Sequence, residues 1–382
     1  MKKKVLIMTE YYYPSVKAGG PVQSIRNIVE NLSNEYDFYI VTSDRDLRDN
    51  KPFNEIKIGK WSDVGEAKVF YGNFKKINLY DTLKILKSID FDIIYINSLF
   101  SSKFSVKIAL LIKAKIVSFD NVVLAPRGEL SKGALSLKKY KKLIFLNLAK
   151  LTFLYNKINW HATAQTEKKD IIKHFGEKSN IFVAENMTRN YDFYEFPSKP
   201  YKYMDEVKLV FISRIHPKKN LITAIKALEG LKGIVVLDIY GPLEDEQYWD
   251  ECLQIIEKLN SNITVNYQGI LKNSEVVKTF EQYHFFIFPT LGENYGHVIS
   301  ESLMGGCPVI TSDQTPWEDL DGQGAGWIVD NKTKNYNSII QNCLDMSNEE
   351  YRSYSLSAFN YGLRENGNKK KRQQYLKMFE NK

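Results

Sequence analysis

The chain has 382 residues, which is too long for one ordinary core and fits two domains of typical size. Hydrophobic residues make up 43% and charged residues 26%, so no long disordered stretch is expected. A formal net charge of +8 indicates anionic partners, namely nucleic acid, a membrane surface or phosphorylated substrates, or else only a Lys-rich coding bias.

The cysteines and the start of the chain bear on the compartment. Cys252, Cys307 and Cys343 are few, odd in number and widely spaced, which excludes a disulfide framework and a metal-binding spacing. We therefore expect a reducing compartment and a cytoplasmic protein. The apolar run Val5–Met8 is broken by two polar residues and is too short for the core of a signal peptide. No apolar run approaches the roughly 18 residues of a membrane span.

Short apolar runs alternate with helical patterns in the first half of the chain. A turn at Gly19 and Gly20 precedes a helical pattern from Ile25 to Leu32. Strands separated by helices predict a parallel sheet with helices on both faces. The predicted strands are Val5–Met8, Phe38–Val41, Ile93–Ile96, Val122–Leu124 and Ile181–Val183.

A second series of the same kind follows Asn190–Glu206, a Tyr- and Pro-rich stretch without periodicity that we interpret as an interdomain linker. Helices are expected at Leu221–Leu228 and after Glu293. Two doubly wound α/β domains with a cleft between them follow, and ligands are expected beyond the carboxyl ends of the strands. The predicted strands of this half are Leu209–Ile212, Ile234–Ile239, Ile263–Tyr267, Phe285–Pro289 and Val309–Thr311.

Arg214 and Lys219 lie in one predicted strand-to-helix loop, after the strand Leu209–Ile212. Two cations, free backbone N–H groups and the positive end of a helix dipole suit a diphosphate. A surface turn with solvated side chains explains this loop equally well when it is taken alone.

Glu293 and Glu301 follow the strand Phe285–Pro289 and are separated by seven residues. Eight positions on a helix are a little over two turns, which predicts that both carboxylates lie on one side. Such a pair can hold two hydroxyl-bearing rings at once, as in a nucleotide sugar. The alternative is a first-turn Glu that stabilises the helix dipole and a second, solvated Glu.

Taken together, the motifs resemble those of glycosyltransferase family 4, a family of retaining GT-B enzymes. GENYGHVISESLMGGCPVITSD is similar to its E-x7-E signature, and SRIHPKKNL to its Arg and Lys pair for the donor diphosphate. YYYPSVKAGGPVQSIRNIVENLS resembles its N-terminal Gly-rich loop, and VAENM the Asn segment that ends its first domain. YGPLEDEQYW and YQGILKNSEV resemble its nucleotide-facing turns. The motifs occur in the right order over nearly the whole chain.

The resemblance implies a role for each matching position. Arg214 and Lys219 would neutralise the donor phosphates and the charge on the leaving group, and Glu293 would contact the transferred sugar; these three are the expected catalytic residues. Glu301 would accept hydrogen bonds from the ribose. The other implied donor contacts are Gly19, Gly20, Gly241, Gly269, Ile270, Asn294, Tyr295, Gly296 and His297.

One departure from the family concerns the loop after the fourth strand of the first domain, where many relatives carry a His. Arg127 takes that place; it can pair with a donor phosphate or an acceptor group but cannot act as a base. His161 is a second candidate for such a contact, against the alternative of a core histidine with a satisfied ring.

The stretch Ser131–Asn159 mixes seven lysines with large apolar residues. A basic, apolar helix there would rest on an anionic membrane. The alternative is a buried helix with a solvated Lys face.

The sequence thus predicts a GT-B fold, with an acceptor domain at 1–195, a nucleotide-sugar domain at 196–364 and a helix at about 365–382 that packs back on the first domain. The expected activity is retaining transfer from a UDP- or GDP-sugar to a saccharide acceptor, lipid-linked, in bacterial surface polysaccharide assembly. No metal or other cofactor is expected, because Arg and Lys face the phosphates. No nucleic-acid partner is expected either. The rivals are a sugar-nucleotide epimerase of the same architecture and a basic nucleic-acid-binding protein, which lacks a reader motif.

Overall fold

The computed structural model describes residues 2–74, 76–136, 138–189, 194–293, 295–330 and 333–381. The chain forms two compact units. Unit 1 is Met1–Asn190 with Asn368–Lys382, and unit 2 is Tyr191–Gly367. Both divisions fall within about five residues of the boundaries expected from the sequence, and residues 190–193 of the expected linker lie outside the described part of the chain.

Unit 1 contains an eight-stranded sheet in the order β3-β4-β2-β1-β5-β6-β7-β8, parallel except that β3 runs antiparallel to β4. Its strands are β1 (Lys3–Thr9), β2 (Tyr36–Ser43), β3 (Trp61–Val64), β4 (Ala67–Gly72), β5 (Ile93–Asn97), β6 (Asn121–Ala125), β7 (Asn159–Ala162) and β8 (Ile181–Val183). Its helices are α1 (Gly20–Leu32), α2 (Leu79–Leu86), the π-helix η1 (Ser102–Val106), α3 (Lys107–Lys113), α4 (Lys132–Ser136), α5 (Lys139–Leu151), α6 (Gln165–Phe175) and α13 (Asn368–Glu380).

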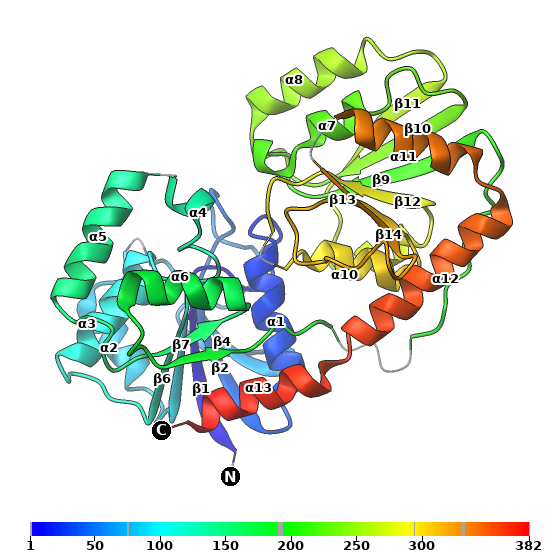
Figure 1. The fold of residues 1–382 in the computed structure, drawn as a ribbon. Helices are drawn as coiled ribbons and strands as arrows, with labels where there is room; N and C mark the ends of the chain where they lie inside the picture. The colour runs from blue at the N-terminus through cyan, green and yellow to red at the C-terminus, as the bar shows by residue number, and fades with distance from the viewer. Residues whose placement is uncertain are drawn as a thin grey trace. The chain divides into compact units, whose positions relative to one another are not determined.

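Successive residues of a strand point to opposite sides of the sheet, and in unit 1 the residues on both sides are apolar and buried. Val5 and Ile7 of β1 join the core under α1 and α13, whereas Leu6 and Met8 join the core under α3, α5 and α6. Helices therefore cover both faces, as the continuous apolar runs of the strands predict (Figure 1).

Unit 2 contains a six-stranded parallel sheet in the order β11-β10-β9-β12-β13-β14, with one large core. Its strands are β9 (Glu206–Ile212), β10 (Ile234–Tyr240), β11 (Ile263–Gly269), β12 (Phe285–Phe288), β13 (Val309–Ser312) and β14 (Gly326–Val329). Its helices are the 3-10 turn η2 (Pro217–Lys219), α7 (Leu221–Lys226), α8 (Glu246–Ile256), α9 (Val276–Phe280), α10 (His297–Met304), α11 (Thr333–Asp345) and α12 (Asn348–Glu365).

The described part of the expected linker packs on unit 2 through two buried lysines. Lys199 Nζ donates to the carbonyls of Phe280 (2.8 Å) and Gly305 (3.0 Å), at the carboxyl ends of α9 and α10. Lys202 Nζ donates to the carbonyl of Leu344 (3.0 Å), near the end of α11. A cation at a helix carboxyl end satisfies its unpaired carbonyls, so this stretch is a fixed part of unit 2 rather than a free linker.

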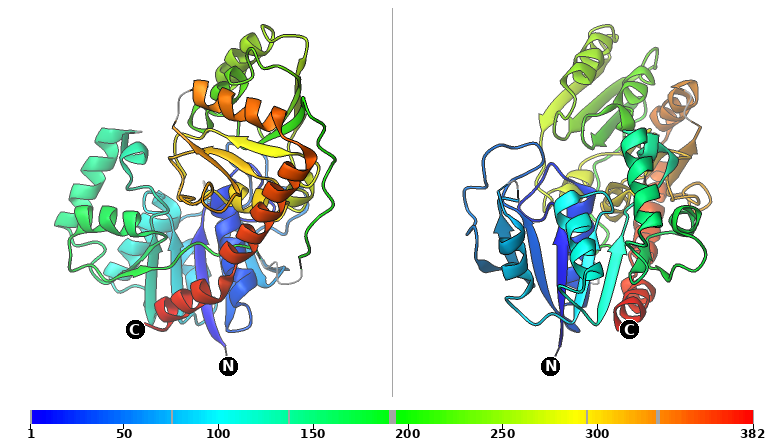
Figure 2. Two further views of the ribbon diagram at one scale, coloured as in Figure 1. Left: turned by 45° about the vertical axis from the view of Figure 1, so that its right-hand side comes forward. Right: turned by 90° about the vertical axis from the view of Figure 1, so that its left-hand side faces the viewer.

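The helix expected at about 365–382 corresponds to α13 (Asn368–Glu380), which belongs to unit 1 and follows α12 of unit 2. Tyr375 and Met378 of α13 are fully buried, and α13 lies beside α1, β6 and β8 (Figure 2). Asn121 Nδ2 donates to the carbonyls of Met378 (2.9 Å) and Phe379 (3.1 Å), which caps the carboxyl end of α13.

No described helix is both long and apolar enough to cross a bilayer. The basic stretch 131–159, expected as one helix, is divided into α4 and α5, and Lys138 between them has a left-handed backbone (φ 56°).

Candidate functional site

The loops after β9 and β12 lie against each other at the carboxyl edge of the unit 2 sheet. The backbone N–H of Leu291 donates to the carbonyl of Lys218 (2.9 Å), and Asn220 Nδ2 donates to the carbonyl of Pro289 (2.9 Å). These bonds bring the Lys219 ammonium into an ion pair with Glu293. The structure thus joins two of the expected catalytic residues, which are 74 positions apart in sequence.

The Lys219–Glu293 pair is largely withdrawn from water, with side-chain exposures of 12% and 15%. Burial lowers the pKa of Lys219, and the neighbouring Glu293 carboxylate partly opposes that shift. The ammonium also lies over the Phe288 ring, 5.4 Å from its centroid. The pair therefore holds a desolvated cation beside strand ends, where it can meet an anionic ligand.

Arg214 forms a second ion pair in this region, with a residue that the sequence analysis missed. Its Nη1 lies 2.5 Å from Glu244 Oε2, and the two side chains are 35% and 12% exposed. Glu244 follows β10, so the rule that ligand-binding residues follow parallel strands could have pointed to it. The positive charge of Arg214 also contributes to lowering the pKa of Lys219.

Gly241 directly follows β10 and Gly269 ends the neighbouring strand β11, and the Gly241 N–H donates to the Gly269 carbonyl (2.8 Å). Gly241 has φ +141°, and a Cβ there would lie 1.8 Å from the Ser213 carbonyl oxygen. Gly241 is therefore required for close backbone packing. Gly269 has φ +85° with open space around it, and Ile270 beside it is 50% exposed. Their expected contact with the nucleotide stays a prediction.

Helix α10 begins at His297, so of the two expected carboxylates only Glu301 is helical. Glu293 belongs to the loop before α10, in agreement with the helix expected after Glu293, and the expectation that the two carboxylates lie on one side stays a prediction. Gly296 has a left-handed backbone (φ +76°) at the N-cap, and the Tyr295 carbonyl accepts from Trp317 Nε1 (2.6 Å). Asn294 lies outside the described residues.

Gly19 and Gly20 belong to unit 1 and lead from the β1 loop into α1. Gly19 is the N-cap with φ 62°, and a Cβ on either glycine would meet no atom within 4 Å. The space beside both glycines is open, and their expected contact with the donor diphosphate stays a prediction.

Arg127 is held in unit 1 by neutral partners. Its Nε donates to Asn97 Oδ1 (2.7 Å) and its Nη1 to Asn186 Oδ1 (2.6 Å). Its Nη2 donates to the Tyr95 hydroxyl (2.8 Å). The guanidinium thus connects the ends of β5 and β6 with the segment after β8, and its expected contact with a phosphate or acceptor stays a prediction.

His161 lies in β7 and is fully buried. Its Nε2 faces the Ala184 carbonyl (2.8 Å), so Nε2 carries the proton and Nδ1 accepts from the Tyr95 hydroxyl (2.7 Å). Burial, together with the Arg127 charge, lowers the pKa of His161 to about 3. A neutral ring with both nitrogens bonded offers nothing to a ligand, which corrects the acceptor or phosphate contact considered for His161.

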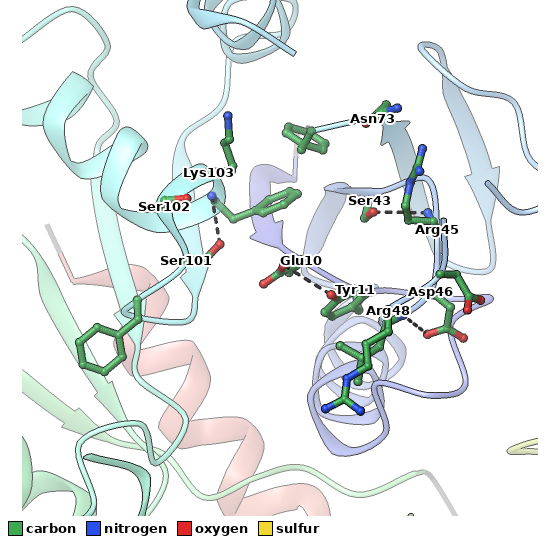
Figure 3. Close-up of a pocket in the computed structure, with 15 residues that line it drawn as sticks. Glu10, Tyr11, Ser43, Arg45, Asp46, Arg48, Asn73, Ser101, Ser102 and Lys103 are labelled. Atoms are coloured by element: carbon green, nitrogen blue, oxygen red, sulfur yellow. Dashed lines mark hydrogen bonds between the residues drawn. The ribbon is translucent and has the colours of Figure 1, made fainter. Parts of the chain in front are cut away.

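A pocket of about 520 Å³ opens at the carboxyl ends of β1, β2, β4 and β5 in unit 1 (Figure 3). Figure 3 shows Glu10 and Tyr11 between Lys103 on one side and Arg45 and Arg48 on the other. The pocket also contains serine and asparagine side chains and phenylalanine rings, so polar groups and apolar rings line it together.

The floor of this pocket is fixed by Asp46, whose carboxylate accepts from Ser15 Oγ (2.5 Å) and from the backbone N–H groups of Val16 (2.9 Å) and Leu47 (2.7 Å). Burial raises the pKa of Glu10, so this carboxylate holds its proton more readily than a solvated one. Glu10 directly follows β1, and the strand-end rule could have identified it; the other lining residues come from separate loops that only folding brings together.

Among the described side chains, no group of three or more His, Cys, Asp and Glu residues is placed to hold a metal ion. The expectation that no metal is needed stays a prediction.

Comparison with known proteins agrees with this architecture. Residues 192–358 match the family described as "Glycosyl transferases group 1". The O-antigen chain mannosyltransferase B of Escherichia coli is 24% identical over 127 residues, which are 32% of this chain. The match spans 32% of that relative's length.

Solved structures resemble the chain over almost its whole length. The Anabaena protein Alr3699/HepE, crystallised with UDP and glucose, has a TM-score of 0.68 at 16% identity and covers 98% of both chains. Sucrose-phosphate synthase of Thermosynechococcus elongatus has a TM-score of 0.70 at 13% identity, with 99% of this chain and 98% of that chain covered. WaaG, a glycosyltransferase of lipopolysaccharide biosynthesis, has a TM-score of 0.58 at 12% identity, with 97% and 99% covered. The chain therefore has the GT-B fold, and its residues 192–358 are similar to the group 1 glycosyl transferases.

Proposed function

We propose that this GT-B chain is a retaining glycosyltransferase that moves a sugar from a UDP- or GDP-sugar to a saccharide acceptor. The proposal rests mainly on the cluster of Arg214, Lys219 and Glu293 at the strand ends of the group 1 domain. The UDP and glucose held by the Anabaena structure support a nucleotide-sugar donor.

In the proposed reaction, the donor diphosphate competes with Glu293 and Glu244 for the two cations. Lys219 and Arg214 stabilise the negative charge that grows on the leaving phosphate, which is where preorganised charge accelerates a reaction most. Glu293, released from the ion pair, accepts hydrogen bonds from hydroxyls of the transferred sugar. Glu301 accepts hydrogen bonds from the ribose.

Retention follows from attack on the face that the diphosphate leaves. The bond between the anomeric carbon and the phosphate oxygen breaks, and the acceptor oxygen forms its bond on the same side. The proton of the acceptor hydroxyl passes to the departing phosphate oxygen. This route requires no protein nucleophile and no metal, and it relies on the two cations instead.

We assign the acceptor to the pocket of unit 1 around Glu10, because its hydroxyl, amide and aromatic side chains suit a saccharide. The O-antigen mannosyltransferase and the lipopolysaccharide enzyme among the similar proteins support a role in bacterial surface polysaccharide assembly. Such assembly uses lipid-linked saccharides, which would bring this protein to the inner face of the cytoplasmic membrane.

The surface of α5 supports a peripheral position on an anionic membrane. Tyr140, Ile144, Leu148 and Leu151 are 81%, 61%, 54% and 75% exposed, and their spacing places them along one side of the helix. The apolar residues of this stretch are therefore not all in the core, and lysines flank them. Figure 1 shows α5 at the margin of unit 1. An exposed apolar row among cations is the surface that enters an anionic bilayer interface.

The decisive experiment screens a panel of UDP- and GDP-sugars by thermal shift and then tests the binders with saccharide acceptors. The expected product keeps the anomeric configuration of the donor, as read by NMR coupling constants. Inverted product would refute retention. Isomerised nucleotide sugar in the absence of acceptor would identify an epimerase, and tight, salt-sensitive binding of DNA or RNA would favour the nucleic-acid alternative.

Vesicle flotation tests the membrane proposal. Wild-type protein should float with phosphatidylglycerol vesicles at low salt and less at physiological salt. Replacing Lys138, Lys139, Lys141 and Lys142 with Ser should release it. If the wild type stays unbound at both salt concentrations, α5 is a solvated helix face.

A further inference from the structure

A second hollow of unit 1, of about 560 Å³, lies away from the strand ends that carry the proposed chemistry. It opens at the amino ends of β6 and β7, since Asn121 and Asn159 begin these strands. The last turn of α5 and the loops before β6 and β8 form its walls. The amino edge of a parallel sheet is not where such folds place their substrates, so this hollow is separate from the acceptor pocket.

Phe153 stands at the hollow in a backbone conformation that favours glycine. Helix α5 ends in a Schellman motif: the Leu154 N–H donates to the Ala149 carbonyl (2.9 Å) and the Phe153 N–H to the Lys150 carbonyl (3.0 Å). The position after the cap is usually Gly, yet Phe153 occupies it with φ 53° and leaves its side chain 65% exposed. The left-handed backbone of Phe153 costs about 1–2 kcal/mol. Because the exposed ring does not fill the core, this strain indicates a role outside folding.

The hollow is positively charged. Lys150, Lys157 and Lys178 line it, and Asp120 is the acidic residue among its lining. Within the described part of the chain these three lysines form no ion pair. Unpaired cations around a concave surface attract an anionic group.

A row of asparagine amides crosses the same hollow. Asn180 Nδ2 donates to Asn159 Oδ1 (2.7 Å), and Asn159 Nδ2 donates to Asn121 Oδ1 (2.8 Å). Asn121 in turn caps α13, so the row is anchored in the fold. Asn180, at the outer end of the row, is exposed, and its side-chain Oδ1 can accept from a hydroxyl-bearing ligand.

Exposed apolar residues also occur at the ends of α3 and α5. Leu151 beside Phe153 is 75% exposed, and Leu110 and Ile116 at the end of α3 are 53% and 44% exposed. Lys113 of α3 donates to the carbonyl of Thr152, which holds the ends of α3 and α5 together. Because Lys150 of α5 lines the hollow and the next residue, Leu151, belongs to the exposed row of α5, the hollow adjoins the exposed face of α5.

We propose that this hollow binds the glycerophosphate headgroup of an anionic phospholipid. Lys150, Lys157 and Lys178 would meet the phosphate and the Asn180 amide the glycerol hydroxyls, while Phe153 and Leu151 enter the acyl region. The inference rests on the proposed membrane association and adds to it a specific lipid contact. It distinguishes a shaped headgroup site from attraction by charge alone.

The test compares two kinds of vesicle with equal negative charge. One contains phosphatidylcholine and phosphatidylglycerol; the other contains phosphatidylcholine and oleate, an anion that has no phosphate headgroup. Wild-type protein should prefer the phosphatidylglycerol vesicles. Lys157→Ser/Lys178→Ser should weaken binding to them by about thirtyfold, the loss expected for two cations at an anionic surface, and abolish the preference. Lys226→Ser/Lys258→Ser, which removes two exposed lysines of unit 2, is the matched control and should keep it.

Phe153→Gly separates binding from folding. Gly suits φ 53°, so this variant should unfold at or above the wild-type temperature while its vesicle binding falls. Unchanged preference in both Phe153→Gly and the double lysine variant would overturn the headgroup site and leave charge-driven membrane binding intact.

A soluble probe covers the case in which the wild type binds no vesicle. Glycerol 1-phosphate should then still shift the NMR resonances of Phe153 and Asn180, and the absence of any shift would overturn the site. Sugar transfer to a soluble acceptor should be the same in Phe153→Gly and wild type, so failure of the proposed enzyme activity is seen independently.

Discussion

Replacing Lys219 with Ala should damage both stability and activity, whereas replacing Arg214 should damage mainly activity. The Lys219–Glu293 pair is 12% and 15% exposed, so removing the lysine leaves a mostly buried carboxylate without its partner. Breaking such a pair typically costs about 3–5 kcal/mol. The residual exposure favours the lower end, about 3 kcal/mol, because water can still reach the carboxylate.

The expected shift in melting temperature follows from the size of unit 2. A domain of that size loses about 2–4 °C per kcal/mol, so Lys219→Ala should lower its Tm by roughly 6–12 °C. The Arg214–Glu244 pair is more exposed on the Arg side, at 35%, so the pair itself contributes no more than about 1 kcal/mol. Because Arg214→Ala also takes this partner from Glu244, which is 12% exposed, it should lower the Tm as well, though less than Lys219→Ala. Turnover should fall by on the order of 10²-fold or more in both variants, because each removes charge that stabilises the leaving group.

Calorimetry and a nucleotide-release assay on the same preparations separate the two effects. The double variant Lys219→Met/Glu293→Gln is the control, because it removes both charges and keeps the volume; it should recover most of the lost Tm and none of the activity. If the double variant is no more stable than Lys219→Ala, the loss comes from packing rather than from an unpaired carboxylate. Wild-type turnover in Arg214→Ala or Lys219→Ala would remove that residue from the mechanism.

Three further predictions concern the metal, the glycines and pH. Activity should survive EDTA, and activity abolished by EDTA and restored by Mg²⁺ or Mn²⁺ would refute the metal-free scheme. Gly241→Ala should destabilise unit 2 by at least about 3 kcal/mol in urea titrations, because its Cβ would lie 1.8 Å from a carbonyl oxygen, whereas Gly269→Ala should cost only about 1 kcal/mol. Since the folded-state pKa of His161 lies below its ordinary value, at about 3, its neutral ring stabilises the fold above pH 6.5, and this contribution is lost by up to about 1.4 kcal/mol per pH unit as the pH falls toward 3. Urea titrations from pH 7 to 5 should show a smaller pH slope for His161→Gln, and equal slopes would contradict the buried neutral ring.

The sequence predicted ten of the strands, including the edge strands β8 and β11, and missed β3, β4, β7 and β14. β1, β5, β9 and β12 are runs of apolar residues in a sheet covered on both faces, and such runs are visible without knowing their neighbours. β3, with the sequence WSDV, is short and half polar at the sheet edge, so neither composition nor periodicity marks it.

The residues of the candidate site were also predictable only in part. Arg214 and Glu293 each follow a strand, and the strand-end rule finds them. Their ion-pair partners, Glu244 for Arg214 and Lys219 for Glu293, depend on how the loops fold back. The spacing of these residues in the sequence does not show that. The pocket around Glu10 is built from loops at positions 10, 43–49, 73 and 100–104, and only the order of the strands brings them together.

The lysines that give the chain its positive charge differ in burial. Lys199 and Lys202 are buried and cap helix ends, and Lys219 is paired inside a loop cluster, so none of these three contributes much to the outer field. Lys150, Lys157 and Lys178 face solvent on unit 1. Salt screens exposed charges within about 8–10 Å but acts little on buried pairs. Raising the salt concentration should therefore release the protein from vesicles before it weakens the Lys219–Glu293 pair, so membrane binding and fold stability can be measured apart in one titration.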